Sequence, residues 1–108
     1  IYVMDEINHK ISDGNFEIQI STNRFTQSTV IKLSDRYPYS DVASFKTLEF
    51  NLEQVRMIDS TSIGYLIELN NKLKADPAAA QLVLSLGSNS ELKELLRRFQ
   101  IDKILTIS

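Results

Sequence analysis

Two kinds of apolar pattern alternate along this chain, and their order restricts the fold more than any other feature of the sequence. Apolar residues recur at every second position over residues 16–21 and, within residues 45–52, at 48, 50 and 52, which is typical of strands. In other segments they recur three or four positions apart, which is typical of helices with one buried face. The resulting order is hairpin, helix, strand, helix, strand, helix, strand. It predicts an α/β fold with a mixed sheet of four to five strands and helices packed mainly on one face.

Turn and stop residues divide the first two thirds of the chain into these elements. Asp13 and Gly14 separate two alternating stretches, residues 7–12 and 16–21, and predict a tight turn between antiparallel strands. A helix is expected over residues 26–37, with Pro38 as its stop. After the strand at 45–52 and a connection at 53–57, a second helix is expected to run from the polar segment at 59–62 to residue 75.

The last third of the chain predicts a strand, a helix and a short closing strand. Residues 82–86 are nearly all apolar and predict an interior strand covered on both faces. Ser88 precedes Glu91 by three positions, the spacing of a capping box, and predicts the start of a third helix. Residues 104–107 are expected to form the closing strand. The apolar face of the third helix is expected to consist of Leu92, Leu95, Leu96 and Phe99.

Length and composition fit one domain. The 108 residues are 43% hydrophobic and 24% charged, which favours a single domain over residues 1–108. The first residue is Ile and not Met, which fits a sequence that has been trimmed at its N-terminus. The chain has no Cys, which excludes disulfides, thiolate metal ligands and cysteine nucleophiles and agrees with a cytoplasmic location. The longest strictly apolar run, residues 1–4, is far below the ~20 residues of a membrane span, so no membrane insertion is expected.

The charge balance argues against nucleic acid as a partner. Twelve Lys and Arg against fourteen Asp and Glu give a net charge of -2, the wrong sign for a surface that binds phosphate backbones. Lys93 and Arg97 belong to a late basic cluster, but Glu91 and Glu94 interleave with them. This cluster is therefore interpreted as a solvated helix face.

The residue inventory offers little for catalysis. His9 is the only histidine, so a histidine-rich metal site is excluded and a Ser/His/Asp triad depends on this one residue. Gly14, Gly64 and Gly87 stand far apart, whereas phosphate-binding loops need closely spaced glycines. No cofactor or metal is expected.

The most conspicuous polar segment is Asp59-Ser60-Thr61-Ser62, which lies directly before the second predicted helix. Side chains of these types accept hydrogen bonds from the free amides of a helix start, so capping alone accounts for one or two of them. The others are candidates for an exposed docking patch. Tyr65 either joins this patch or packs into the core.

Residues 57–66, Met-Ile-Asp-Ser-Thr-Ser-Ile-Gly-Tyr-Leu, resemble the signature of STAS domains, the family of bacterial anti-sigma factor antagonists. In that family an Asp-Ser-Ser-Gly-Leu-Gly run opens the second helix. Residues 48–52 and 82–86 resemble the family's strands before and after this helix, and residues 99–105, Phe-Gln-Ile-Asp-Lys-Ile-Leu, are similar to its closing segment. The resemblance covers residues 44–108 well and the first 43 loosely.

The resemblance implies roles for individual residues. Ser60 stands at the position of the serine that is phosphorylated in the family, and Asp59 matches the acid of the motif. Gly64 matches the second glycine, whereas Ser62 replaces the first. The implied partner-binding residues are Asp59, Ser60, Thr61, Ser62 and Gly64.

The function implied by the resemblance is that of a regulatory binding module without catalytic activity. Its partner would be an anti-sigma factor that is also a serine kinase, and a cognate phosphatase would reverse the phosphorylation of Ser60. Two alternatives remain open. The first is a STAS domain that serves as a cytoplasmic subunit of a lipid or anion transport system or as a stress-signalling scaffold. The second is an enzyme that uses Ser60 as nucleophile, which requires His9 beside it.

Overall fold

The first hairpin forms around the Asp-Gly turn that its sequence predicts. The computed structural model describes residues 6–108, so the apolar run at residues 1–4 lies outside the described residues. Strands β1 (Ile7–Ser12) and β2 (Asn15–Ile20) pair antiparallel. Between them Asp13 has φ 49° and Gly14 has φ 82°. Positive φ at both central residues is what a two-residue hairpin turn requires, and glycine adopts it without strain.

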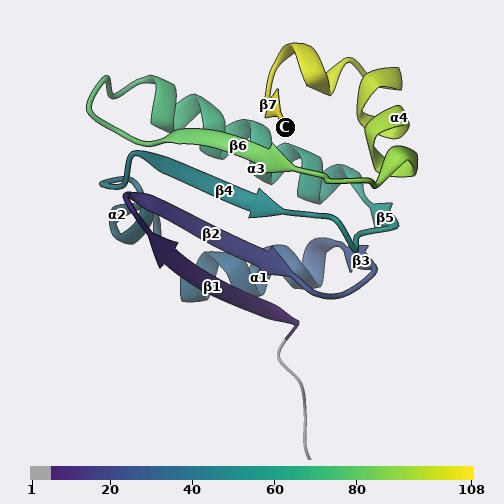
Figure 1. The fold of residues 1–108 in the computed structure, drawn as a ribbon, viewed down its shortest axis with the longest axis horizontal. Helices are drawn as coiled ribbons and strands as arrows, with labels where there is room; N and C mark the ends of the chain where they lie inside the picture. Colours follow the sequence, from purple (N-terminus) through teal and green to yellow (C-terminus); the bar gives the residue numbers. More distant parts are fainter. Residues whose placement is uncertain (1–5) are drawn as a thin grey trace, which may run out of the picture.

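Five strands form one mixed sheet in the order β1-β2-β4-β6-β7 (Figure 1). Strands β4 (Thr47–Asn51), β6 (Gln81–Ser85) and β7 (Thr106–Ile107) each run parallel to their neighbour, starting from β2. Only β1 is antiparallel. The predicted α/β class and the mixed sheet are therefore confirmed.

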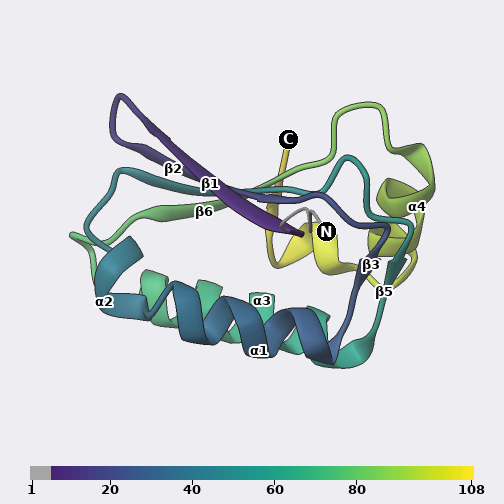
Figure 2. The same cartoon turned by 90° about the horizontal axis from the view of Figure 1, so that it is seen from below.

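The two longer helices before β6 cover the same face of this sheet. Helices α1 (Gln27–Arg36) and α3 (Ser60–Lys74) lie side by side beneath the strands in Figure 2. Alternate strand residues point toward them and are buried, as the period-two pattern predicts. These core residues include Phe16, Ile18, Ile20, Leu48, Phe50, Leu82 and Leu84.

The expectation that residues 82–86 are covered on both faces is wrong. Leu82 and Leu84 are buried, but Val83 and Ser85 between them are only partly buried. The reason is that α1 and α3 lie on one side of the sheet, which leaves the other face of β6 half open. Aliphatic Val83 tolerates this half-exposed position, so its presence made the strand resemble a fully covered one.

The open face of the sheet carries a polar ladder. Glu17 of β2 accepts hydrogen bonds from the side-chain amides of Gln19 at 3.0 Å and Asn51 at 3.1 Å, and Lys10 lies 3.7 Å from its other oxygen. Burial by itself would raise the pKa of Glu17, but these donors and the Lys10 charge outweigh it and lower the pKa below the ordinary value. Glu17 is therefore a stabilised carboxylate on a face that no described helix covers.

A second, two-stranded sheet lies beside the first and was not predicted. Strands β3 (Arg24–Phe25) and β5 (Met57–Ile58) pair parallel, with Phe25 opposite Ile58. Each strand has two residues, which is too short for alternation to show in the sequence. This small sheet brings the segments that lead into α1 and α3 side by side.

Helix boundaries agree with the sequence except after Pro38 and at the third predicted helix. A short helix, α2 (Tyr39–Val42), follows Pro38. Helix α4 (Ser90–Arg98) is capped by Asn89 and not by Ser88 as predicted. Asn89 is buried, accepts from the Leu92 amide at 3.2 Å and donates to the Leu52 carbonyl at 3.1 Å. One amide side chain thus joins the helix start to the end of β4, which a hydroxyl with a single donor cannot do as well.

The end of the chain departs from the pattern in one further respect. Phe99, expected on the apolar face of the last helix, is 60% exposed, because the helix ends at Arg98 and Phe99 is its C-cap. A short 3₁₀ helix, η1 (Ile101–Lys103), then leads to β7. Ile101 and Leu105 of this segment enter the core.

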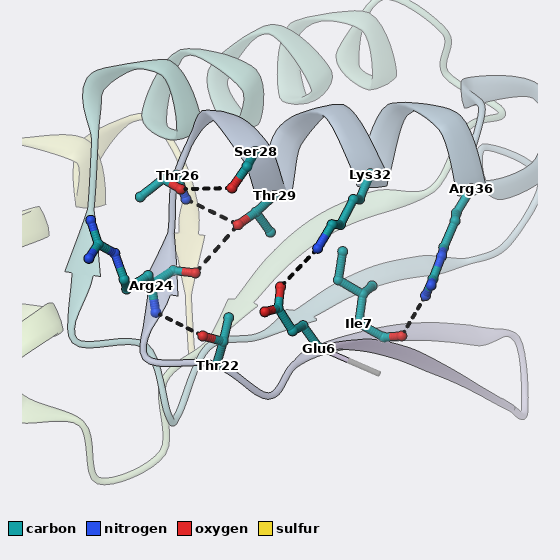
Figure 3. Close-up of polar contacts among 9 residues, drawn as sticks. All are labelled: Glu6, Ile7, Thr22, Arg24, Thr26, Ser28, Thr29, Lys32 and Arg36. Carbon is teal, nitrogen blue, oxygen red and sulfur yellow. Dashed lines mark hydrogen bonds and ion pairs between the residues drawn. The ribbon is translucent and has the colours of Figure 1, made fainter. Parts of the chain in front are cut away.

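Side chains of α1 reach the edge strand β1 and Glu6, the residue directly before it (Figure 3). The Lys32 ammonium lies 3.1 Å from the Glu6 carboxylate, and the Arg36 guanidinium donates to the Ile7 carbonyl at 2.8 Å. Both contacts join residues that lie more than twenty positions apart. They hold the outer strand of the sheet against the helix layer.

Candidate functional site

The polar segment before α3 is organised by Asp59. Asp59 is the N-cap of the helix, and its Oδ1 accepts a hydrogen bond from the Ser62 amide at 2.9 Å. Its second oxygen, Oδ2, accepts from the Gln27 amide at 3.0 Å, in the first turn of α1. One carboxylate therefore satisfies a free amide at the start of each of two helices.

The pKa of the Asp59 carboxyl lies below its ordinary value. The main cause is the hydrogen bond from the Ser62 amide, and the Gln27 amide adds to it. Both amides stabilise the charged form, and burial opposes them only in part. Asp59 is thus a structural anion, committed to the two helix starts.

Ser62 is a core residue, so the expectation that it belongs to a partner-binding surface is wrong. Its side chain is 0% exposed, and its Oγ donates to the Phe25 carbonyl at 2.8 Å. Phe25 lies in β3, the strand that leads into α1. Ser62 therefore adds a second link between the two helix starts, and it lies below the surface, where a partner does not reach it.

Ser60 and Thr61 occupy the exposed side of the same turn. Ser60 is the first residue of α3, and both side chains are exposed. Neither hydroxyl forms a hydrogen bond with another described residue. Gly64 is exposed one turn later on the same helix. The structure therefore separates the predicted residues: Ser60, Thr61 and Gly64 are exposed, Asp59 is partly buried as the helix cap, and only Ser62 lies in the core.

Sequence reasoning missed the contribution of the α1 start. Thr26, Ser28 and Thr29 form a hydroxyl cluster there (Figure 3). The Thr29 Oγ1 accepts from the Thr26 amide at 3.2 Å, and the Thr26 and Ser28 hydroxyls lie 3.3 Å apart. Because the Gln27 amide bonds Asp59, this cluster adjoins the start of α3. Threonine at 26 and 29 has the spacing of a helix cap, but nothing in the sequence pairs it with position 59.

A groove of about 620 Å³ lies between α1 and α3 and begins next to this region. Thr61 and Gly64 line one end of it, and the segment at residues 37–39 and Lys72 line the other. Tyr65 also lines the groove, but its ring packs edge-on against Phe50 with centroids 6.3 Å apart. Burial raises the pKa of Tyr65 to about 12. Tyr65 therefore serves mainly as core packing.

His9 lies away from Ser60. Its Nδ1 is 3.0 Å from the Tyr37 hydroxyl, and its ring stacks on Phe16. Tyr37 follows the C-terminal end of α1, whereas Asp59 contacts the N-terminal end, and ten helical residues span about 15 Å. This arrangement gives no support to a nucleophile and base formed by Ser60 and His9.

Within residues 6–108, no three histidine, aspartate or glutamate residues come together in a way that would hold a metal ion. Over that same range, every helix is too short or too polar to cross a lipid bilayer.

The fold is that of STAS domains. A STAS domain protein of Planctomyces limnophilus, described as an anti-sigma factor antagonist, superposes with a TM-score of 0.75 over 98% of this chain and 91% of its own, at 17% sequence identity. No protein-family model and no curated protein matches the sequence. The similarity is thus one of three-dimensional structure.

Two structures of the anti-sigma factor antagonist SpoIIAA are also similar to this chain. The unphosphorylated form has a TM-score of 0.66 over 94% of this chain and 86% of its own, at 13% identity. The phosphorylated form, from Bacillus, has a TM-score of 0.64 over 94% of this chain and 90% of its own, also at 13% identity. At these identities the comparisons establish the STAS fold.

Proposed function

We propose that residues 1–108 form a regulatory binding module of the anti-sigma factor antagonist type, which is switched by phosphorylation of Ser60. The observation that carries this proposal is the placement of two adjacent side chains. Asp59 makes the cap of α3, while the Ser60 hydroxyl is exposed and has no hydrogen bond to another described residue. A kinase can therefore reach Ser60, and its modification leaves the cap in place.

The partner in this proposal is an anti-sigma factor with serine kinase activity, and a phosphatase restores the unmodified state. The module acts in the cytoplasm, needs no cofactor of its own and catalyses no reaction. Two similar structures support the idea of a switch, because SpoIIAA has been solved in unphosphorylated and phosphorylated forms and both resemble this chain to nearly the same degree. The surface that meets the partner includes Asp59, Ser60, Thr61 and Gly64.

Electrostatics explains how one phosphate can stop binding without unfolding the domain. A phosphoserine carries about -1.5 to -2 charges, and helix N-termini favour anions through their free amides and the helix dipole. At Ser60 the modified side chain is therefore compatible with α3. In a complex, however, the same charge must be desolvated beside the Asp59 carboxylate, which is costly without a matching cation. The free module tolerates the phosphate, and the complex does not.

The proposal is tested by phosphorylation in a lysate of the organism of origin supplied with ATP. Mass spectrometry is expected to find one phosphate, on Ser60. The Ser60→Ala variant should lose this signal and still capture the partner, whereas the Ser60→Asp variant should capture it weakly. Ser90→Ala is the matched control, because Ser90 is likewise the exposed first residue of a helix, α4, and this variant should be phosphorylated normally.

The identity of the captured protein separates the proposal from its alternative. A partner with a histidine-kinase-like ATPase domain agrees with the anti-sigma factor reading. Phosphate confined to Thr61, or no phosphate under any growth condition, would contradict it. Capture of a membrane transport subunit would favour the transport or scaffold role.

A further inference from the structure

The groove between α1 and α3 is built as a recessed track along the outer surface of the helix layer. Its α3 wall contains Gly64, Glu68 and Lys72, which follow one another at intervals of four residues. From Thr61 to Lys72 the track covers eleven residues of helix, or about 16 Å. This length suits a short segment of another protein. The track starts one residue after Ser60.

Gly64 lies in the interior of α3 without an internal reason for the absence of a side chain. A Cβ built at this position meets nothing within 4 Å, and its backbone φ is not in the left-handed region. Glycine in a helix interior costs about 0.5–1 kcal/mol relative to alanine. The packing of this domain does not require that cost. The open backbone at Gly64 is suited to the close approach of a group from outside.

Glu68 is an uncompensated acid in the same track. Its carboxylate makes no ion pair with another described residue, although Lys72 stands four positions later on the helix. The Lys72 ammonium lies instead 6.0 Å from the centroid of the Tyr39 ring. Glu68 is exposed and therefore presents a negative charge without an ion pair in the same groove as Gly64.

Two tyrosines that line the groove are held in place by internal contacts. The Tyr39 hydroxyl donates to the Lys72 carbonyl at 3.2 Å, and the Tyr37 hydroxyl lies 3.0 Å from His9 Nδ1. Their hydroxyls are thus engaged, and so are their rings, because Tyr37 packs edge-on against His9 and the Lys72 ammonium lies over the Tyr39 ring. The group that the groove leaves open to a partner is therefore the exposed Glu68 carboxylate. A carboxylate pairs well with a guanidinium group, whose planar fork can donate two parallel hydrogen bonds to it.

We propose that the α1–α3 groove binds an arginine-bearing segment of a partner protein, with the arginine paired to Glu68 and the backbone of the segment crossing α3 at Gly64. The net charge of -2 on the chain likewise favours a positively charged partner. The proposal rests on the proposed function for the identity of the partner. The recognition chemistry is a property of the groove and can be tested without that partner.

The probe is the tripeptide acetyl-Leu-Arg-Leu-amide, and its control is the same peptide with uncharged citrulline in place of arginine. Both are titrated into the ¹⁵N-labelled protein, and amide chemical shifts are followed. The arginine peptide should give saturable shifts at Gly64, Tyr65 and Glu68. The citrulline peptide should bind about tenfold more weakly, as expected for loss of a charged hydrogen bond.

Three variants complete the test. Glu68→Gln should weaken the arginine peptide by about tenfold, whereas the matched charge change Asp102→Asn, on the exposed η1 segment, should leave the affinity unchanged. Gly64→Leu should abolish binding in a folded protein. A Cβ at this position meets nothing within 4 Å, so the leucine side chain can be accommodated and would occupy the groove. Circular dichroism checks that each variant is folded.

The outcomes separate this proposal from the role of Ser60. Ser60→Ala should bind the peptide as well as the unmodified protein does. Peptide binding by a protein that is never phosphorylated would therefore support the groove proposal and contradict the proposed switch at Ser60. Equal affinity for both peptides, no effect of Glu68→Gln, or shifts confined to the open sheet face at Glu17 would each overturn the groove proposal. A phosphorylated Ser60 would stand unaffected by that result.

Discussion

The Gln27 amide donates a 3.0 Å hydrogen bond to the Asp59 carboxylate, and this contact fastens the first turn of α1 to the cap of α3. The two residues are 32 positions apart. The Ser62 hydroxyl makes a parallel link to the Phe25 carbonyl below it. The proposed regulatory serine is thus presented by a helix start that is held at two points.

Replacing Asp59 by alanine is expected to lower the free energy of unfolding by about 1–2 kcal/mol, within the range of about 0.5–2 kcal/mol for loss of an N-cap. The upper part of that range applies because the Gln27 amide loses its acceptor as well. Urea denaturation measures the change. Asp102→Ala, at an exposed position in η1, is the control and should change stability by less than about 0.5 kcal/mol. Equal effects of the two variants would contradict the role of Asp59.

A negative charge should have opposite consequences at Ser60 and Ser62. Ser60→Asp introduces the charge at an exposed helix start and should alter the unfolding free energy by no more than about 0.5 kcal/mol. Ser62→Asp buries the charge at a position that is 0% exposed and should cost on the order of 3 kcal/mol or more. Thermal unfolding of the two variants compares them directly. Similar melting temperatures would show that Ser62 is not sealed in the core.

Stability is expected to fall in acid through two carboxylates. Asp59 and Glu17 both have folded-state pKa values below the ordinary values of 3.8 and 4.5. A group whose pKa is lowered on folding contributes stability above its unfolded pKa and loses it as the pH falls through the folded pKa. Unfolding free energy should therefore decline below about pH 4.5. Denaturation at several pH values should show a shallower decline in the Asp59→Asn, Glu17→Gln double variant, and an unchanged slope would refute this assignment.

Gly64→Ala is expected to stabilise the isolated domain by about 0.5–1 kcal/mol, because alanine favours the helix and its methyl group meets nothing within 4 Å. Gly87→Ala provides the opposite case. Gly87 has φ 54°, a backbone conformation that strains any residue with a Cβ, and the Glu53 side chain would have to move away from an added methyl group. Urea denaturation should place the two variants on either side of the parent protein. Destabilisation by Gly64→Ala would remove the idea that the glycine is kept for an external contact.

Most of the fold could be predicted because its long elements carry regular patterns. The Asp13-Gly14 pair predicts its turn from two adjacent residues. The alternation in β2 and β4 and the helical spacing in α3 extend over enough residues to predict each element from its own sequence. The two-residue strands β3 and β5 could not be found, since their pairing depends on segments more than thirty positions apart. Val83 misled the prediction for β6 because an aliphatic residue suits a half-open face as well as a buried one.

The residues of the candidate site could be predicted from the sequence, but the burial of each side chain could not. A polar run before an apolar helix predicts a cap, and Asp59 makes it. Which hydroxyl faces solvent depends on where the helix sits against β3, and this contact buries Ser62 while leaving Ser60 exposed. The shift of the α4 cap from Ser88 to Asn89 has the same origin, because Asn89 is selected by its bond to the Leu52 carbonyl.

The contact between Arg36 and the Ile7 carbonyl also bears on how these molecules behave when crowded together. An edge strand with free backbone groups is a template on which further chains can add and build insoluble assemblies. On β1 the guanidinium occupies one of these carbonyls, and Lys10 places a charge in the middle of the strand. A chain that lost both cations would be prone to aggregate through this edge, even with its core and its helix starts intact.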